Sequence, residues 1–189
     1  MDEPTTRAAK RAATAQRIIE AAQAEFGERG LEKATVRGIA QRAGVDPSLV
    51  IQHYGSKNGL FAVATRLDGD SIGDDVADHL FEVLDIRLAG LPPHTMALVR
   101  SMLTAPEATT AMREHLNERI ENLARTSTDA DAELRAALTV SSILGLTIAR
   151  HFLALDGLTD ISPEQVEAVL RPWLTAALDP TPLDTGAPS

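Results

Sequence analysis

Residues 35–57, TVRGIAQRAGVDPSLVIQHYGSK, predict two short helices joined by a tight turn. Thr35 can cap the first helix, expected over residues 36–43, and Gly44 ends it. The second helix is expected over residues 47–54, behind an Asp–Pro pair that supplies a capping side chain and a proline at the first helical position. Two short helices in this order have the proportions of a helix-turn-helix motif.

The residue types inside this stretch fit the steric needs of such a motif. Ala40 is small where the two helices approach most closely, and Gly44 stands where the backbone needs a positive φ. Four apolar side chains can fill the small core between the helices: Ile39, Ala43, Val45 and Val50.

Helical patterns continue on both sides of the motif. Over residues 12–29, Ile18, Ile19, Ala22 and Phe26 share one stripe at helical spacing, and a glycine at position 30 closes that helix. Aromatic residues are only 3% of the chain, and β-branched runs are scarce. We therefore predict an all-α protein. The later helices are expected over residues 57–67, 74–88, 93–103, 106–125, 129–155 and 163–178.

Three parts of the chain follow from this pattern. Residues 1–60 form a three-helix helix-turn-helix domain for DNA binding, with an N-terminal arm. Residues 61–178 are expected to form a second, larger helical domain. The tail over residues 179–189 is rich in proline and is expected to be disordered.

Charge is distributed unevenly between these parts. The formal net charge is −9, but residues 7–57 carry nine Lys/Arg against five Asp/Glu, a local +4. Residues 61–189 carry nine Arg against twenty Asp/Glu, a local −11. A basic head on an acidic body is typical of a chain in which one part meets DNA and the other does not.

Several classes of function are disfavoured by composition. The chain has no cysteine, which excludes disulfides, Cys-ligated zinc and thiol catalysis. The five histidines lie far apart, and no nucleophile elbow or phosphate-binding glycine loop is present. Asp74, Asp75 and Asp78 are explained by a solvated helix face. We expect no metal, no cofactor and no enzymatic activity. The polar start and the lack of an apolar run of about 20 residues favour a cytoplasmic protein with no membrane partner.

The flanks of the motif extend it into a known pattern. The first helix ends in F-x-x-x-G, and an aromatic residue followed by K-x-x-L comes after the second short helix. With these features, residues 14–64 resemble the tetracycline-repressor (TetR) family of transcriptional regulators. Two places depart from the family pattern: Gly38 lies inside a helix, and Asn58–Gly59 replaces the common acidic residues. The matching residues are Phe26, Gly30, Thr35, Ile39, Ala40, Ala43, Gly44, Val45, Tyr54, Lys57 and Leu60.

The resemblance implies that the helix over residues 47–54 enters the major groove of a DNA operator. Gln52 is the favoured base-reading residue, because an amide can pair bidentately with adenine. The alternative for Tyr54 is a core aromatic. Arg7, Lys10, Arg11 and Arg17 could reach a neighbouring groove as a mobile arm, and the alternative for this arm is a solvated tail. The residues expected to contact DNA are Thr35, Arg37, Arg42, Ser48, Gln52, His53, Tyr54 and Lys57.

The resemblance also implies that the domain over residues 61–178 binds a ligand and dimerises, because members of the family pair through their last two helices. We expect a homodimer here, although each apolar stripe could instead pack on its own chain. The apolar stripe on the helix over residues 129–155 forms the predicted seam between the two copies. The small residues Ser141 and Gly145 would allow the two helices to approach closely in its middle. The residues expected at the dimer interface are Leu134, Leu138, Ser141, Gly145, Ile148, Phe152, Leu155, Val166, Leu170 and Trp173.

The resemblance further implies a small-molecule effector, bound between the middle helices, that releases the repressor from a palindromic operator. Ordinary core packing is the alternative for each candidate residue, and a small-molecule or protein-binding module with a vestigial DNA-binding head is the alternative function. The residues expected to line the effector site are Met96, Val99, Met102, Leu103, Leu116, Ile120, Leu123, Leu146, Thr147, Arg150 and His151.

Overall fold

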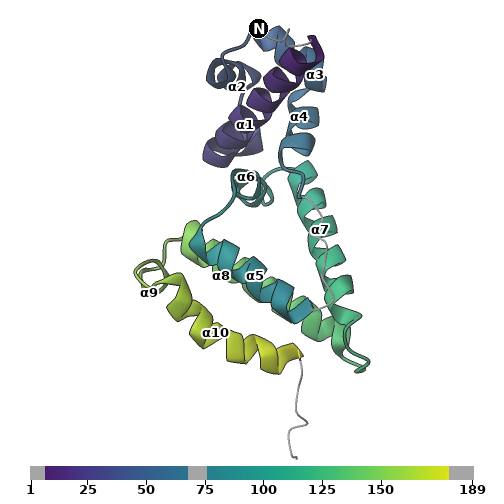
Figure 1. The fold of residues 1–189 in the computed structure, drawn as a ribbon, viewed down its shortest axis with the longest axis vertical. Helices are drawn as coiled ribbons and strands as arrows, with labels where there is room; N and C mark the ends of the chain where they lie inside the picture. The colour runs from purple at the N-terminus through teal and green to yellow at the C-terminus, as the bar shows by residue number, and fades with distance from the viewer. Residues whose placement is uncertain (1–6, 68–75, 179–189) are drawn as a thin grey trace, which may run out of the picture. The chain divides into compact units, whose positions relative to one another are not determined.

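The computed structural model describes residues 7–67 and 76–178, which form helices and connecting turns with no strand in these ranges (Figure 1). The all-α prediction is confirmed. The tail predicted over residues 179–189 lies outside the described residues, as do Asp74 and Asp75. The helices are α1 (Arg7–Lys33), α2 (Val36–Ala43), α3 (Pro47–Tyr54), α4 (Lys57–Ala64), α5 (Val76–Ala89), α6 (Pro93–Ser101), α7 (Pro106–Ala124), α8 (Ala132–His151), α9 (Asp156–Thr159) and α10 (Pro163–Leu178).

The helices group into two compact units. The first unit holds residues 7–67 and 92–115, so it contains α1–α4, α6 and the first half of α7. The second holds residues 76–91 and 116–178, with α5, the rest of α7 and α8–α10. The domain boundary after residue 60 stays a prediction.

The core of the first unit is built around α1, which packs on α2, α4 and α6. Phe26 of α1 and Phe61 of α4 are fully enclosed and meet edge to face, with ring centroids 5.1 Å apart. Gly30 has a φ of 73° and breaks α1 near its end, which confirms the predicted stop there. Beyond the break, the Leu31 amide donates to Ser101 Oγ of α6 at 2.9 Å, so α6 is joined to α1 by a buried hydrogen bond as well as by packing.

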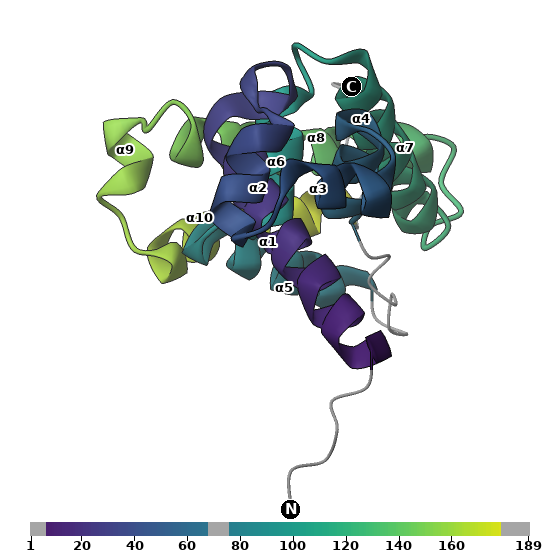
Figure 2. The same ribbon diagram turned by 90° about the horizontal axis from the view of Figure 1, so that it is seen from above.

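The helix-turn-helix forms by the local interactions that its sequence predicts. The Gly38 amide donates to Thr35 Oγ1 at 3.0 Å, which caps α2. Gly44 ends α2 with a φ of 64°, and Asp46 caps α3 by accepting from the Ser48 amide at 2.8 Å. The two views show α2 and α3 beside α1 (Figure 1, Figure 2).

The second unit is centred on α5, α8 and α10, which contact one another. Leu84 and Leu88 of α5 are buried with Leu174 of α10. Arg150 of α8 donates through Nε to Leu88 O at 3.1 Å, and through Nη1 to the carbonyls of Leu158 and Ile161. One arginine therefore connects the end of α5 to α9 and to the turn that follows α9.

The helix predicted over residues 129–155 is shorter in the structure. α8 ends at His151, with Phe152 at its C-terminal boundary. Ala154 has a φ of 49°, a left-handed conformation that a continuing helix cannot contain, and the short helix α9 follows. Leu155 therefore lies outside α8, and the predicted seam does not reach it in helical register.

Candidate nucleic-acid interface

α3 presents a polar face outward from the helix-turn-helix. Val50 anchors the helix in the core of the first unit, whereas Ser48 and Gln52 are exposed and His53 is half-buried. Ser48 Oγ donates to Asp46 Oδ1 at 2.6 Å, and these hydrogen bonds from Ser48 lower the pKa of the Asp46 carboxyl. The Gln52 side chain is exposed to solvent and its amide has no hydrogen-bond partner among the described residues, the state that pairing with a base edge requires.

Tyr54 connects the end of α3 to α1. Its hydroxyl donates to Ala15 O at 3.0 Å, and partial burial raises the pKa of Tyr54. The ring lies 5.9 Å from that of His53. Tyr54 can therefore be a core aromatic or a DNA contact, because its ring is packed while the residue stays half-exposed.

Lys57 lies at the start of α4 and is half-buried. Its ammonium group donates to three carbonyls near the end of α1: Leu31 O at 2.7 Å, Ala34 O at 3.1 Å and Glu32 O at 3.2 Å. A cation is favourable at the C-terminal end of a helix, where backbone carbonyls lack partners. The expected phosphate contact of Lys57 stays a prediction, and the structure adds this capping interaction.

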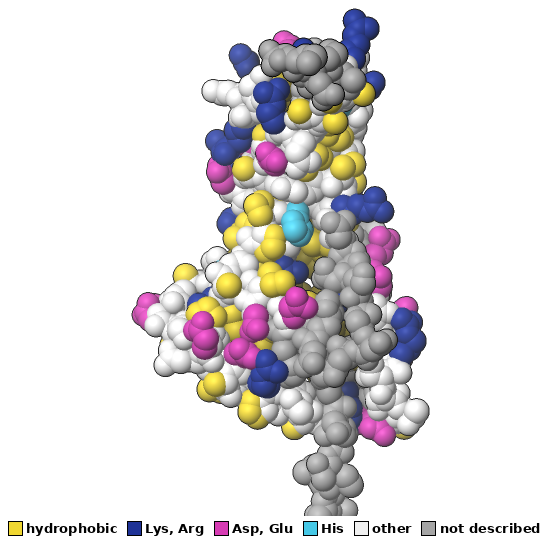
Figure 3. Space-filling view, in the orientation of Figure 1, with side chains coloured by type: hydrophobic (Ala, Val, Ile, Leu, Met, Phe, Trp, Pro, Cys, Tyr) yellow, Lys and Arg dark blue, Asp and Glu magenta, His cyan; other side chains and the backbone are white. Residues whose placement is uncertain are grey.

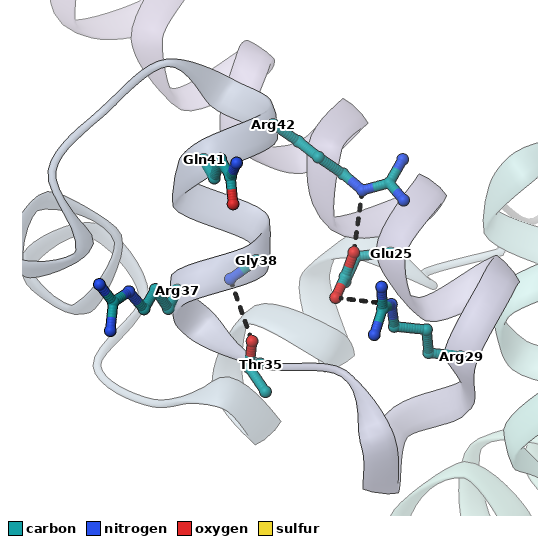
Figure 4. Close-up of a pocket in the computed structure, with 7 residues that line it drawn as sticks. All are labelled: Glu25, Arg29, Thr35, Arg37, Gly38, Gln41 and Arg42. Atoms are coloured by element: carbon teal, nitrogen blue, oxygen red, sulfur yellow. Dashed lines mark hydrogen bonds and ion pairs between the residues drawn. The ribbon is translucent and has the colours of Figure 1, made fainter.

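The two arginines of α2 differ in their surroundings. Arg37 is exposed, and its side chain extends away from α1 (Figure 4). Arg42 instead faces α1, where Nε donates to Glu25 Oε2 at 2.8 Å and Nη2 to Glu28. These carboxylates, Glu28 foremost, raise the pKa of Arg42. An open pocket of about 580 Å³ lies over this surface and includes Thr35. Of the predicted DNA contacts on α2, Arg37 is free to meet a ligand and Arg42 is already ion-paired.

Sequence reasoning missed Glu25, and it missed the close approach to Glu25 that explains Gly38. Glu25 is a carboxylate buried on α1, and a Cβ atom on Gly38 would lie 2.5 Å from Glu25 Oε1. The only signal in the sequence was a glycine inside a predicted helix, where it lowers helix stability relative to alanine.

Acidic and basic side chains are distributed in the structure as the sequence predicts. In the space-filling view, Lys and Arg side chains are spread over the unit that contains α1–α4 (Figure 3). Asp and Glu side chains gather over the helices of the other unit in the same view. The excess of positive charge is therefore carried by the unit that also carries the helix-turn-helix, which favours approach to a polyanion.

The residues expected to line an effector site fall in both units. Met96, Val99, Met102 and Leu103 belong to the first unit, and the other seven belong to the second. Leu103 is 84% exposed. Arg150 is bonded to backbone carbonyls, and His151 Nε2 lies 2.5 Å from Arg87 O. The side chains of Arg150 and His151 are thus engaged within their own unit, and the effector set stays a prediction.

The residues expected at a dimer interface divide by exposure. Leu134, Leu138, Ser141 and Gly145 lie on an exposed face of α8, with Leu138 59% exposed. On α10, Trp173 is 52% exposed. Ile148 and Phe152 are half-buried, and Leu155 is exposed outside α8.

Two predicted interface residues of α10 face inward, and one exposed residue was not predicted. Val166 and Leu170 pack on the cluster of Leu84, Leu88 and Leu174. Val169 is 79% exposed, one helical turn before Trp173, and was missed although the spacing of four could have indicated it. The apolar face of α8 and α10, defined as Leu134, Leu138, Val169 and Trp173, remains without a partner in the described chain.

α8 also has the length and apolar composition of a membrane-spanning helix by those two criteria alone. The sequence shows no uninterrupted apolar run over α8, because Thr and Ser interrupt the segment. A helix with one face in its own core and an apolar opposite face has the same composition.

Two family models match the chain and together cover most of it. The model described as bacterial regulatory proteins, tetR family, matches residues 18–64. The model described as tetracyclin repressor-like, C-terminal domain, matches residues 70–178, which is more than half of the chain.

Similar proteins carry related descriptions. The chain is 33% identical over 82 residues to the HTH-type transcriptional regulator BetI of Serratia proteamaculans, covering 43% of this chain and 37% of that protein. It is 33% identical over 88 residues to the HTH-type transcriptional dual regulator CecR of Shigella flexneri, covering 47% of this chain and 38% of that one. The matched segment thus spans less than two fifths of either relative.

Solved structures resemble the whole fold. A transcriptional regulator from Rhodococcus sp. Rha1 superposes with a TM-score of 0.65 at 26% identity, covering 87% of this chain and 95% of that one. NalD, the secondary repressor of the MexAB-OprM multidrug efflux pump in Pseudomonas aeruginosa, gives a TM-score of 0.65 at 19% identity over 86% of this chain and 95% of its own. The second likeness shows the fold alone.

Proposed function

The chain belongs to the TetR family of bacterial regulatory proteins, and from this premise we propose that it is a DNA-binding transcriptional regulator. It acts as a repressor that occupies a near-palindromic operator as a homodimer. A small-molecule effector releases it from the operator. BetI and CecR are described as HTH-type transcriptional regulators, which supports this assignment.

The observation that carries the proposal is the outward face of α3. Ser48 and Gln52 are exposed on a short helix whose opposite side is anchored by Val50. A helix of this size in a helix-turn-helix reads base edges with a few side chains, while flanking groups contact phosphates. Gln52 reads adenine, and Arg37 contacts a base or a phosphate. Residues Thr35, Tyr54 and Lys57 contribute to the phosphate contacts.

A dimer supplies the second half-site. One helix of eight residues contacts too few base pairs to select a site in a genome, whereas two related by a two-fold axis read two half-sites about one helical turn apart. The apolar face of α8 and α10 is the surface through which two copies pair, because its exposed Leu and Trp side chains would otherwise remain in water. Gly145 has open space around it, which leaves room for a close helix approach.

The effector and the cellular setting follow from the family alone. The effector is a small molecule bound among the middle helices, and the protein works in the cytoplasm, where operators are found, without a membrane partner. We expect no catalytic turnover. The competing function is a binding module whose DNA-binding head is vestigial, and the free Gln52 and Arg37 side chains argue against it.

A mobility-shift experiment tests the proposal. Purified protein is mixed with DNA from upstream of its own gene, and with duplexes selected from random sequence, across a salt series and with excess non-specific competitor. A discrete complex that survives competitor and weakens with salt is the expected result. Absence of binding to any duplex, even at low salt, would overturn the proposal in favour of the vestigial head.

A further inference from the structure

Glu25 is a charged group in a place where charge is costly. Its side chain is only 4% exposed on α1. Two arginines compensate it: Arg42 Nε of α2 lies 2.8 Å from Oε2, and Arg29 Nε of α1 lies 3.2 Å from Oε1. A buried carboxylate is retained only where it is paired and hydrogen-bonded, so its two oxygens fix the positions of both guanidinium groups.

Gly38 makes room for this carboxylate. A Cβ atom at Gly38 would lie 2.5 Å from Glu25 Oε1, 3.0 Å from Glu25 Cδ and 3.2 Å from Thr35 Oγ1. Gly38 is inside α2 and has no positive φ, so its backbone conformation does not require glycine. Glycine is unfavourable inside a helix, and the close approach of α2 to Glu25 is the reason that the structure gives for it.

Arg42 connects this carboxylate to the recognition helix. It occupies the last turn of α2, two residues before Gly44 in the turn that leads to α3 (Figure 4). Its guanidinium joins Glu25 and Glu28, both of α1, so the end of α2 next to that turn is held on α1 by ion pairs. A rotation of α2 about α1 would separate these groups and would move α3 with it, because α2 and α3 are packed together.

We propose that Glu25 is a positioning residue for DNA recognition: it holds α2 on α1 through Arg42, with Gly38 as the necessary gap, and thereby sets the orientation of α3. The proposal rests on the proposed function. It assigns to Glu25 no contact with DNA. It predicts that specific binding, which needs α3 in one orientation, depends on Glu25, whereas charge-driven binding to any sequence does not.

The test compares two binding constants for each variant. Fluorescence anisotropy measures affinity for a duplex selected from random DNA by the wild-type protein and for a shuffled duplex of equal length. Glu25→Gln is expected to weaken specific binding about tenfold or more, since a charge-assisted hydrogen bond is lost. Binding to the shuffled duplex should stay equal or rise slightly, because a negative charge has been removed.

Two further variants separate positioning from charge. Glu20→Gln removes the same charge from an exposed site on α1 and should leave the ratio of the two affinities unchanged. Gly38→Ala should weaken specific binding in the wild-type background but cause a clearly smaller loss in a Glu25→Ala background, where the obstructing carboxylate is absent and only the 3.2 Å approach to Thr35 Oγ1 remains. Equal changes for Glu25→Gln and Glu20→Gln, or an equal effect of Gly38→Ala in both backgrounds, would overturn the proposal.

Hydrogen exchange tests the same idea without DNA. Glu25→Gln should accelerate amide exchange in α2 and α3 while leaving α8 unchanged, and unchanged exchange in α2 and α3 would overturn the proposal. If the wild-type protein retains no duplex from the random pool, the proposed function fails. The exchange measurement still decides whether Glu25 positions α2 and α3.

Discussion

Replacing Lys57 with methionine is expected to loosen the C-terminal end of α1. The ammonium group of Lys57 donates to the carbonyls of Leu31, Glu32 and Ala34 at 2.7, 3.2 and 3.1 Å. Methionine keeps most of the aliphatic stem but cannot donate a hydrogen bond. The change therefore removes the charged partner of three carbonyls and little of the packing.

The size of the effect follows from the surroundings of these carbonyls. A hydrogen bond to a charged group is worth about 1.5–3 kcal/mol, and a cation at a helix C-terminus about 0.3–1 kcal/mol. Water can replace the bond at the exposed Glu32 contact, whereas the bonds to Leu31 and Ala34 are partly buried. We expect the free energy of unfolding to fall by about 2–3 kcal/mol, or roughly 5–10 °C in Tm.

Calorimetry measures the loss in the free energy of unfolding, and a matched control separates capping from charge. Lys33→Met removes the same charge from an exposed lysine at the end of α1 and should change the free energy of unfolding by no more than about 0.5 kcal/mol. Equal losses for the two variants would refute the capping argument. The salt dependence of DNA binding gives a separate readout: a slope reduced by about one for Lys57→Met alone would add a phosphate contact to the capping role.

Three further outcomes test the interface, the dimer and the second unit. Gln52→Ala should change the preferred bases in selected duplexes, at about 1–3 kcal/mol per lost contact, and an unchanged preference would contradict the recognition role. Leu138→Glu should give a light-scattering mass near the 20.2 kDa of one chain, whereas a retained dimer mass would exclude this face. Partial desolvation, foremost, and then the Glu167 carboxylate raise the pKa of Asp85, an exposed residue, against the nearby Arg171. A raised pKa means that the folded protein favours the protonated Asp85 carboxyl. The contribution of Asp85 to the free energy of unfolding is therefore present below about pH 4 and lost as pH rises through its folded-state pKa. Asp85→Asn should raise Tm by about 1–3 °C at pH 7 and by nothing near pH 3.5; equal shifts at both pH values would contradict this.

The sequence predicted the helix-turn-helix well because its decisive interactions are local. Thr35, Gly44 and Asp46 each act within three or four residues of their own position, so residue type and spacing suffice. The exposed polar face of α3 follows in the same way from its short length and its single buried Val50.

The partners of Arg42 and the end of α8 were not predictable in this way. Arg42 reads as a free basic residue until α1 is packed beside it, because Glu25 is 17 positions away. At the end of α8, Phe152 and Leu155 continue the apolar spacing although the backbone has left the helix. Periodicity records which side chains are apolar, and it does not record whether the backbone between them stays helical.

The packing of α6 on α1 matters for anyone exchanging DNA-reading heads between regulators. A head cut after α4 would keep the whole helix-turn-helix but lose Ser101, whose hydroxyl accepts from the Leu31 amide, and the cover that Ala97 gives α1 at Gly27. The smallest transplantable module therefore includes a segment that comes later in the chain, so a single splice point cannot carry it. A working chimera needs either two junctions or a donor body whose own sixth helix fits the surface around Gly27, where Met96 Cγ already lies 3.4 Å from the position of a Cβ.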